Sequence, residues 1–263
     1  SVNIHFHGTN VSPKCHSDEV IHTLMPSGDR YVYTIKIPDD EPPGMYWYHP
    51  HVHTLSETAL EGGASGAIEI EGIANLQPAV ADLPERMLIM RDQVVTGGAV
   101  PGGVQPSWDV SLNYVPVSFP QYKPAVIETH AGEQEFWRFT NASADTIADI
   151  ILKFDGKTQP LQIVAYDGVP TGSQDGKRQG TIVTEKDVLV APGGRVEFIV
   201  TAPPADVKKA EFITKAIDTG HLGDIDPQRT LAVLKNVEGP VSLPRVAKRS
   251  GPPNRQRFEN LAD

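Results

Sequence analysis

Two short segments hold five of the nine histidines in this chain of 263 residues. His5 and His7 stand two residues apart in "HFHG", and "YHPHVH" repeats the spacing with His49, His51 and His53. On a β-strand, residues two apart project from the same face, about 6.5–7 Å apart along the chain. Imidazole nitrogens bind copper, zinc, iron and nickel. A lone histidine is usually an ordinary surface or core residue, but two H-x-H pairs beside aromatic residues predict a metal site.

The sequence around these histidines predicts strands. Apolar and polar residues alternate with a period of two, which is typical of half-buried strands. The 23 glycines and 23 prolines provide many turns between short segments, and no long amphipathic helix is evident. The pattern therefore predicts an all-β fold of sandwich or barrel type. The expected strands lie within residues 3–8, 31–38, 45–49, 66–72, 86–95, 125–143, 147–156, 161–170, 188–204 and 211–218.

Composition excludes several classes of protein. The net charge of −10 argues against nucleic acid as a partner, because no broad basic surface could meet the phosphates. No apolar run approaches the roughly 18 residues that a membrane span needs. The single cysteine, Cys15, excludes an internal disulfide. No signal-peptide pattern is present in this chain.

The histidine motifs resemble those of a known family. "HFHG", then "GMYWYHPHVH" and "GGASGAIEIEG", are similar to the N-terminal half of the multicopper oxidases, the laccase-like blue copper oxidases. The resemblance implies copper as the cofactor, with His5 on the type 2 copper and His7, His49 and His51 on the type 3 pair. Asp18 falls near the place where the family has an acid that helps to protonate reduced oxygen, and this implies a catalytic role for it. The alternative for Asp18 is an ordinary solvated loop residue.

The second half of the chain resembles another part of the same family. "EFWRFTNAS", "LQIVAYDGVP" and "LVAPGGRVEFIVTA" are similar to the middle cupredoxin-like domain of three-domain members. We therefore expect two cupredoxin-like Greek-key β-sandwich domains, the first incomplete at its N-terminus. The expected divisions are 1–75 for the domain with the paired histidines, 76–240 for the second domain and 241–263 for a linker or tail. Residues 73–85, with two prolines, are expected to link the domains.

The departures from the family pattern limit the functional prediction. The family completes its cluster with a downstream H-x-x-H-x-H segment and an H-C-H segment whose cysteine binds the type 1 copper. After His53, this chain has only His130 and His221, and both stand alone. The chain is therefore predicted to be a portion of a multicopper oxidase that contributes half of the trinuclear copper site. The complete enzyme would couple oxidation of a small reducing substrate to reduction of dioxygen to water.

Other interpretations of the same histidines stay open. The chain could be a non-catalytic copper-binding protein, or an enzyme with one metal ion held by imidazoles that activates water. Unpaired strand edges in an incomplete sandwich predict pairing with another chain, so a homo-oligomer is possible. The family resemblance implies a periplasmic or secreted location.

Overall fold

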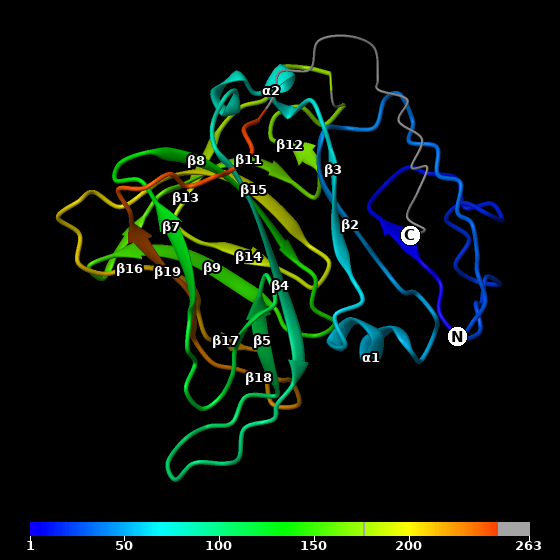
Figure 1. Cartoon of the computed structure of the whole chain (residues 1–263), viewed down its shortest axis with the longest axis horizontal. Coiled ribbons are helices and arrows are strands. Elements are labelled where there is room, and N and C mark those ends of the chain that lie inside the picture. The colour runs from blue at the N-terminus through cyan, green and yellow to red at the C-terminus, as the bar shows by residue number, and fades with distance from the viewer. Residues whose placement is uncertain (176, 247–263) are drawn as a thin grey trace.

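The paired histidines lie in a small antiparallel sheet. The computed structural model describes residues 1–175 and 177–246, and almost all of the regular secondary structure within them is β-strand (Figure 1). The small sheet has the order β1-β2-β3 and consists of β1 (His5–His7), β2 (Gly44–His49) and β3 (Gly66–Ile70). Its register sets His5 opposite His49. The two histidine motifs are therefore neighbours across one strand pair.

The segment between β1 and β2 has no strand, so the strand expected at 31–38 is wrong. Alternation does persist there, since Tyr33 is half-buried while its neighbours Val32 and Thr34 are exposed. A strand also needs a neighbour to complete its hydrogen-bond ladder. Thr34 donates one backbone N–H to the carbonyl of His16, at 2.6 Å, and no ladder continues from it. The side chains of this segment alternate between half-buried and exposed, but no neighbouring strand pairs with it to form a sheet.

A larger sandwich follows, and its two sheets enclose the main hydrophobic core. The eight-stranded sheet has the order β12-β11-β15-β8-β4-β5-β6, with β13 beside β11. Its strands are β4 (Glu85–Val94), β5 (Trp108–Leu112), β6 (Val115–Val117), β8 (Gln134–Asn141), β11 (Leu161–Tyr166), β12 (Val169–Pro170), β13 (Val183–Glu185) and β15 (Arg195–Thr201).

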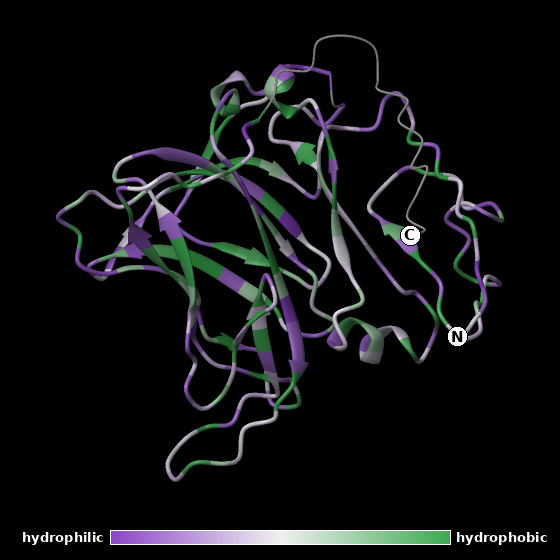
Figure 2. Ribbon diagram, viewed as in Figure 1, coloured by the Kyte–Doolittle hydropathy of each residue, from purple (hydrophilic) through white to green (hydrophobic). Residues whose placement is uncertain are grey.

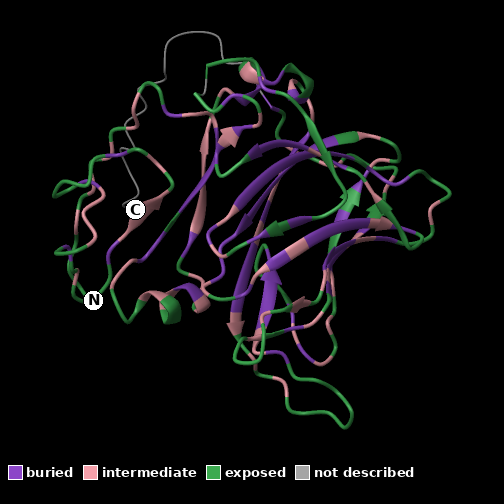
Figure 3. Cartoon of the chain, turned by 180° about the vertical axis from the view of Figure 1, so that it is seen from behind, coloured by how far each residue is buried: buried purple, intermediate pink, exposed green. Residues whose placement is uncertain are grey.

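The facing six-stranded sheet has the order β10-β9-β16-β19-β7, with β14 beside β9. Its strands are β7 (Ala125–Thr129), β9 (Ala148–Phe154), β10 (Lys157–Gln159), β14 (Val188–Val190), β16 (Ala210–Thr214) and β19 (Arg229–Asn236). Apolar and polar segments alternate along these strands in Figure 2, and Figure 3 shows the buried residues gathered in the two sheets. A separate pair, β17 (Ile217–Asp218) and β18 (Ile225–Asp226), completes the strands.

The expected linker is folded against the sandwich. Residues 73–85 contain α2 (Ile73–Leu76) and the 3-10 helix η1 (Pro78–Val80), and both Ile73 and Val80 are fully buried. The start of the expected tail packs here as well, because buried Val246 exchanges backbone hydrogen bonds with residues 82–83. The rest of that tail, 247–263, lies outside the described residues. The domain divisions proposed from the sequence stay predictions.

A buried ion network joins the small sheet to the sandwich. The side chain of Arg138 on β8 has no exposed surface and bonds to Glu69, Glu85 and Glu197. Glu69 lies on β3, whereas Glu85 and Glu197 lie on β4 and β15. Glu197 also accepts the backbone N–H of Met45 on β2, at 2.8 Å. These bonds fix β2 and β3 to the middle strands of the larger sheet.

Candidate metal centre

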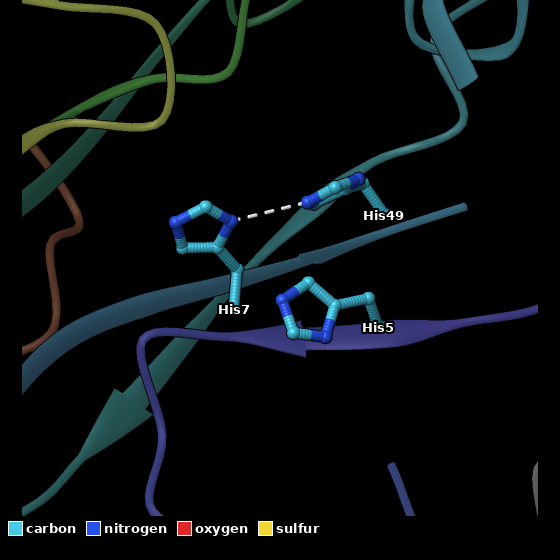
Figure 4. A group of neighbouring side chains, drawn as sticks. All are labelled: His5, His7 and His49. Carbon is cyan, nitrogen blue, oxygen red and sulfur yellow. Dashed lines mark hydrogen bonds between the residues drawn. The ribbon is translucent and has the colours of Figure 1, made fainter. Parts of the chain in front are cut away.

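The structure brings the predicted histidines together. The ring centroid of His5 lies 5.4 Å from that of His7, 5.4 Å from that of His49 and 5.1 Å from that of His51. One ring nitrogen from each of His5, His7 and His49 lies within 4.8 Å of the others. Figure 4 shows these three rings, which β1 and β2 present to a common space. Such spacing suits a metal ion held between imidazoles.

Asp18 fixes the orientation of His5. Its carboxylate oxygens lie 2.9 and 3.0 Å from Nδ1 of His5, and one of them also accepts the backbone N–H of Phe6 at 2.8 Å. When Nδ1 donates its hydrogen to Asp18, the lone pair of Nε2 is free for a metal. Carboxylates orient metal-binding histidines in this way in many proteins. The structure thus places Asp18 in contact with a predicted ligand.

His49 is held by its own chain and by an aromatic neighbour. Its Nδ1 lies 2.8 Å from the carbonyl oxygen of Pro50 and donates to it, so Nε2 carries the lone pair. Nε2 lies 3.2 Å from Nδ1 of His7, the contact drawn as a dashed line in Figure 4. Trp47 stacks on His49 with ring centroids 4.2 Å apart. Trp47, which is 2% exposed, closes the inner side of the group.

His51 is positioned by Asn3, which the sequence pattern did not single out. Asn3 is fully buried, and its side-chain oxygen accepts the backbone N–H of His51 at 2.7 Å. Its amide nitrogen donates to the carbonyl of Val20 at 3.0 Å. Nδ1 of His51 is buried and has no hydrogen-bond partner among the described residues. Buried polar atoms are normally paired, so a free imidazole nitrogen here fits a metal-binding site.

A sequence comparison and several structural comparisons bear on the family. Residues 1–74 match the family model described as multicopper oxidase. The resemblance to multicopper oxidases is confirmed. No curated protein matches the sequence. The family model covers the whole small sheet and both histidine motifs.

Solved multicopper oxidases share the fold over nearly the whole chain. A variant of McoA from Aquifex aeolicus matches with a TM-score of 0.69 and 20% identity, over 96% of this chain and 55% of that one. The metallo-oxidase from Campylobacter jejuni matches with a TM-score of 0.62 and 21% identity, over 97% of this chain and 50% of that one. A blue copper oxidase from Nitrosomonas europaea matches with a TM-score of 0.62 and 23% identity, over 89% and 69%. The predicted cupredoxin-like all-β fold is confirmed, and the chain spans about half the length of the first two oxidases.

Burial lowers the pKa of two of the imidazoles and so favours the neutral form that binds metals. Desolvation, with a contribution from the nearby Arg195 guanidinium, lowers the pKa of His7 from 6.5 to about 3. Desolvation also lowers the pKa of His49 to about 4, although the hydrogen bond to Pro50 opposes the shift. Metals bind the neutral imidazole, so proton competition at these two residues is weak near neutral pH. Arg195 and Gly193 come from the second half of the chain, so the sandwich also shapes the site.

These pKa shifts predict the protonation of the metal-free protein. At pH 5.5 His7 and His49 are expected to remain neutral, whereas an ordinary histidine is mostly charged. The unfolded chain then binds more protons than the folded chain, so stability should fall as pH drops from about 6.5 toward 4. Imidazole NMR titration measures the charge of each ring. His130 is the control, since its hydrogen bonds to Gly239 and Glu133 raise its pKa. Titration of His7 and His49 near 6.5 would contradict the prediction.

The remaining histidines of interest lie outside this group. His53 is exposed, with its ring 5.9 Å from that of His51. His130 bonds to Glu133 and to the carbonyl of Gly239. His221 is exposed, as is the single cysteine, Cys15. None of His130, His221 and Cys15 belongs to the close group of His5, His7 and His49.

A cavity of about 450 Å³ opens beside the histidines. It lies between β2, α1 (Ser56–Glu61) and two loops of the sandwich. Its walls are formed by His7, Trp47, His49, His51, His53, Ser56, Glu57, Leu60, Ser143, Ala144, Asp145, Pro192 and Gly193. The cavity gives small molecules and ions a route to the imidazoles.

Proposed function

We propose that this chain contributes half of the trinuclear copper site of a multicopper oxidase. His5, His7, His49 and His51 would hold the copper ions, with His5 on the type 2 copper and the other three on the type 3 pair. The observation that carries the proposal is the convergence of these four imidazoles from β1, from β2 and from the residues just after β2. Copper tops the stability order of divalent metals for nitrogen ligands.

In this proposal the complete enzyme oxidises a small reducing substrate and reduces dioxygen to water. Bound copper would supply the one-electron redox chemistry. The protein residues would hold and orient the site: Asp18 fixes the ring of His5, Asn3 fixes the backbone of His51, and Trp47 excludes water from one side of His49. Asp18 is also the nearest candidate for passing a proton to reduced oxygen, because its carboxylate already bonds His5.

The missing ligands must come from elsewhere in this proposal. The sequence holds neither the H-x-x-H-x-H nor the H-C-H segment that completes the family's copper sites. A further part of the same protein, or a different chain, would supply them together with the type 1 copper. We place the protein in the periplasm or outside the cell by its likeness to bacterial oxidases. None of the helices in residues 1–175 and 177–246 is both long and apolar enough to cross a membrane.

A second candidate function rests on the three histidines whose ring nitrogens lie closest together. One nitrogen each from His5, His7 and His49 lies within 4.8 Å of the others, and this arrangement could hold a single ion. Three imidazoles with an open position suit one zinc that activates water, or a copper that is stored without catalysis. Metal identity and stoichiometry distinguish these candidates from the oxidase.

The chain alone is expected to bind copper without being an efficient oxidase. Electron paramagnetic resonance of the copper-loaded protein should show coupling to imidazole nitrogen, and its absorption spectrum should lack an intense blue thiolate–copper band. Oxygen uptake with a phenol or with Cu⁺ should stay below roughly one turnover per second, the lower end of ordinary enzyme rates. Preferential binding of one zinc would favour the single-metal function. Faster turnover would mean that this chain completes the site itself.

A further inference from the structure

A second group of possible ligands, three carboxylates, lies beside the cavity, where Glu57 and Asp145 form part of the wall. Glu57 and Glu61 stand four residues apart on α1, and Asp145 faces them from the loop after β8. One carboxylate oxygen from each lies within 4.8 Å of the others. Among the described residues, none of these carboxylates is in an ion pair with a lysine or arginine. Like charges four residues apart on a helix repel, so this arrangement costs stability unless a cation is present.

Two buried oxygen atoms of this region have no hydrogen-bond partner among the described residues. Ser143, which is 2% exposed, lines the cavity two residues before Asp145, and its hydroxyl has no partner among the described residues. One carboxylate oxygen of Glu61 is also buried and unpartnered. Since buried polar groups are normally hydrogen-bonded, these unpaired oxygen atoms favour the binding of a polar or charged species beside the cavity.

We propose that Glu57, Glu61 and Asp145 bind a divalent cation beside the cavity that His7, His49 and His51 also line. These carboxylates would bind incoming Cu²⁺ before it reaches the histidines, and this role rests on the proposed function. The existence of the site does not, because its ligands are separate from the histidines.

The chemistry of the donors supports a cation with a preference for oxygen. Carboxylates and hydroxyls suit hard divalent ions, whereas imidazoles suit copper and zinc. Burial and the neighbouring carboxylates raise the pKa of Glu61, and burial with Asp92 and Glu57 raises that of Asp145. Asp92 itself is used internally, since it accepts the backbone N–H groups of residues 144–146. A bound cation would relieve the repulsion among the other three.

Mn²⁺ tests the site independently of copper, because Mn²⁺ binds carboxylates well and imidazoles weakly. Electron paramagnetic resonance of free Mn²⁺ should show that the wild-type chain binds it. The double variant Glu57→Gln, Asp145→Asn should bind at least roughly tenfold more weakly, because two charged ligands are lost. Both residues are exposed, so the fold should tolerate the changes. Glu238→Gln, which removes another exposed carboxylate, should leave Mn²⁺ binding unchanged.

Copper loading gives the second readout. In stopped-flow mixing, the double variant should take up Cu²⁺ more slowly than wild type and with less dependence on salt, while its final copper affinity stays the same. Equal Mn²⁺ binding in wild type and the double variant, or no binding in wild type, would overturn the cation site. Mn²⁺ binding that is lost in the variant, in a chain whose histidines bind no copper, would support this site while contradicting the proposed function.

Discussion

Arg138→Ala is expected to lower the free energy of unfolding by about 3–5 kcal/mol, the cost of breaking a buried ion network by removing one partner. The Arg138 side chain is fully buried between three glutamates, and Glu197 is fully buried as well. Without the guanidinium, at least two carboxylates would be left in a dry environment with no compensating charge. Burial raises the pKa of Glu197 even beside Arg138, whose positive charge opposes that rise.

Urea unfolding of the two proteins measures this loss. Arg178→Ala is the matched control, because Arg178 pairs with Asp175 at the surface, where its side chain is 66% exposed. Exposed pairs contribute about 0–1 kcal/mol, so the control should unfold almost as wild type does. Hydrogen exchange should also rise in β2 and β3, since Glu69 and Glu197 bind the small sheet to the sandwich. A loss as small as that of the control would show that the network does not stabilise this junction.

The alternation of side chains along a strand was enough to predict which histidines share a face. The H-x-H spacing placed His5 and His7 on one face of β1, and the structure has them there. The pairing of His5 with His49 joins residues 44 positions apart, and no local pattern can predict that register. The family resemblance predicted that the two histidine strands lie side by side, and the structure supplies their register.

The sequence could not reveal the residues that act through long-range contacts. Asn3 looks like any strand residue, yet it fixes His51 through a backbone hydrogen bond across 48 positions. Arg138 lies in "FWRFT", and a charged side chain on a strand usually faces solvent. The small sheet covers that face of β8, so Arg138 becomes buried and needs partners. Residues 31–38 show the reverse error. Their side chains alternate in burial, but the segment is not a β-strand because no neighbouring strand pairs with it.

The double variant His5→Ala, His7→Ala is expected to weaken copper binding by more than about 100-fold. Loss of an outer partner of a metal ligand already costs 10–100-fold in affinity, and removing two of four proposed ligands should cost more. Both residues come from β1, so the change leaves His49 at the end of β2 and His51 just after it without the opposite half of the group. Competition titration with a chelator of known copper affinity measures the loss.

His130→Ala is the control for this measurement, because His130 lies outside the group and bonds to Glu133 and Gly239 instead. It should bind copper as wild type does. Circular dichroism of both variants separates lost ligands from lost structure. His5 and His7 are only half-buried, so alanine should leave the main core intact. If the folded double variant kept wild-type copper affinity, the copper would be bound elsewhere, and the strand-borne imidazoles would not be the ligands that their geometry suggests.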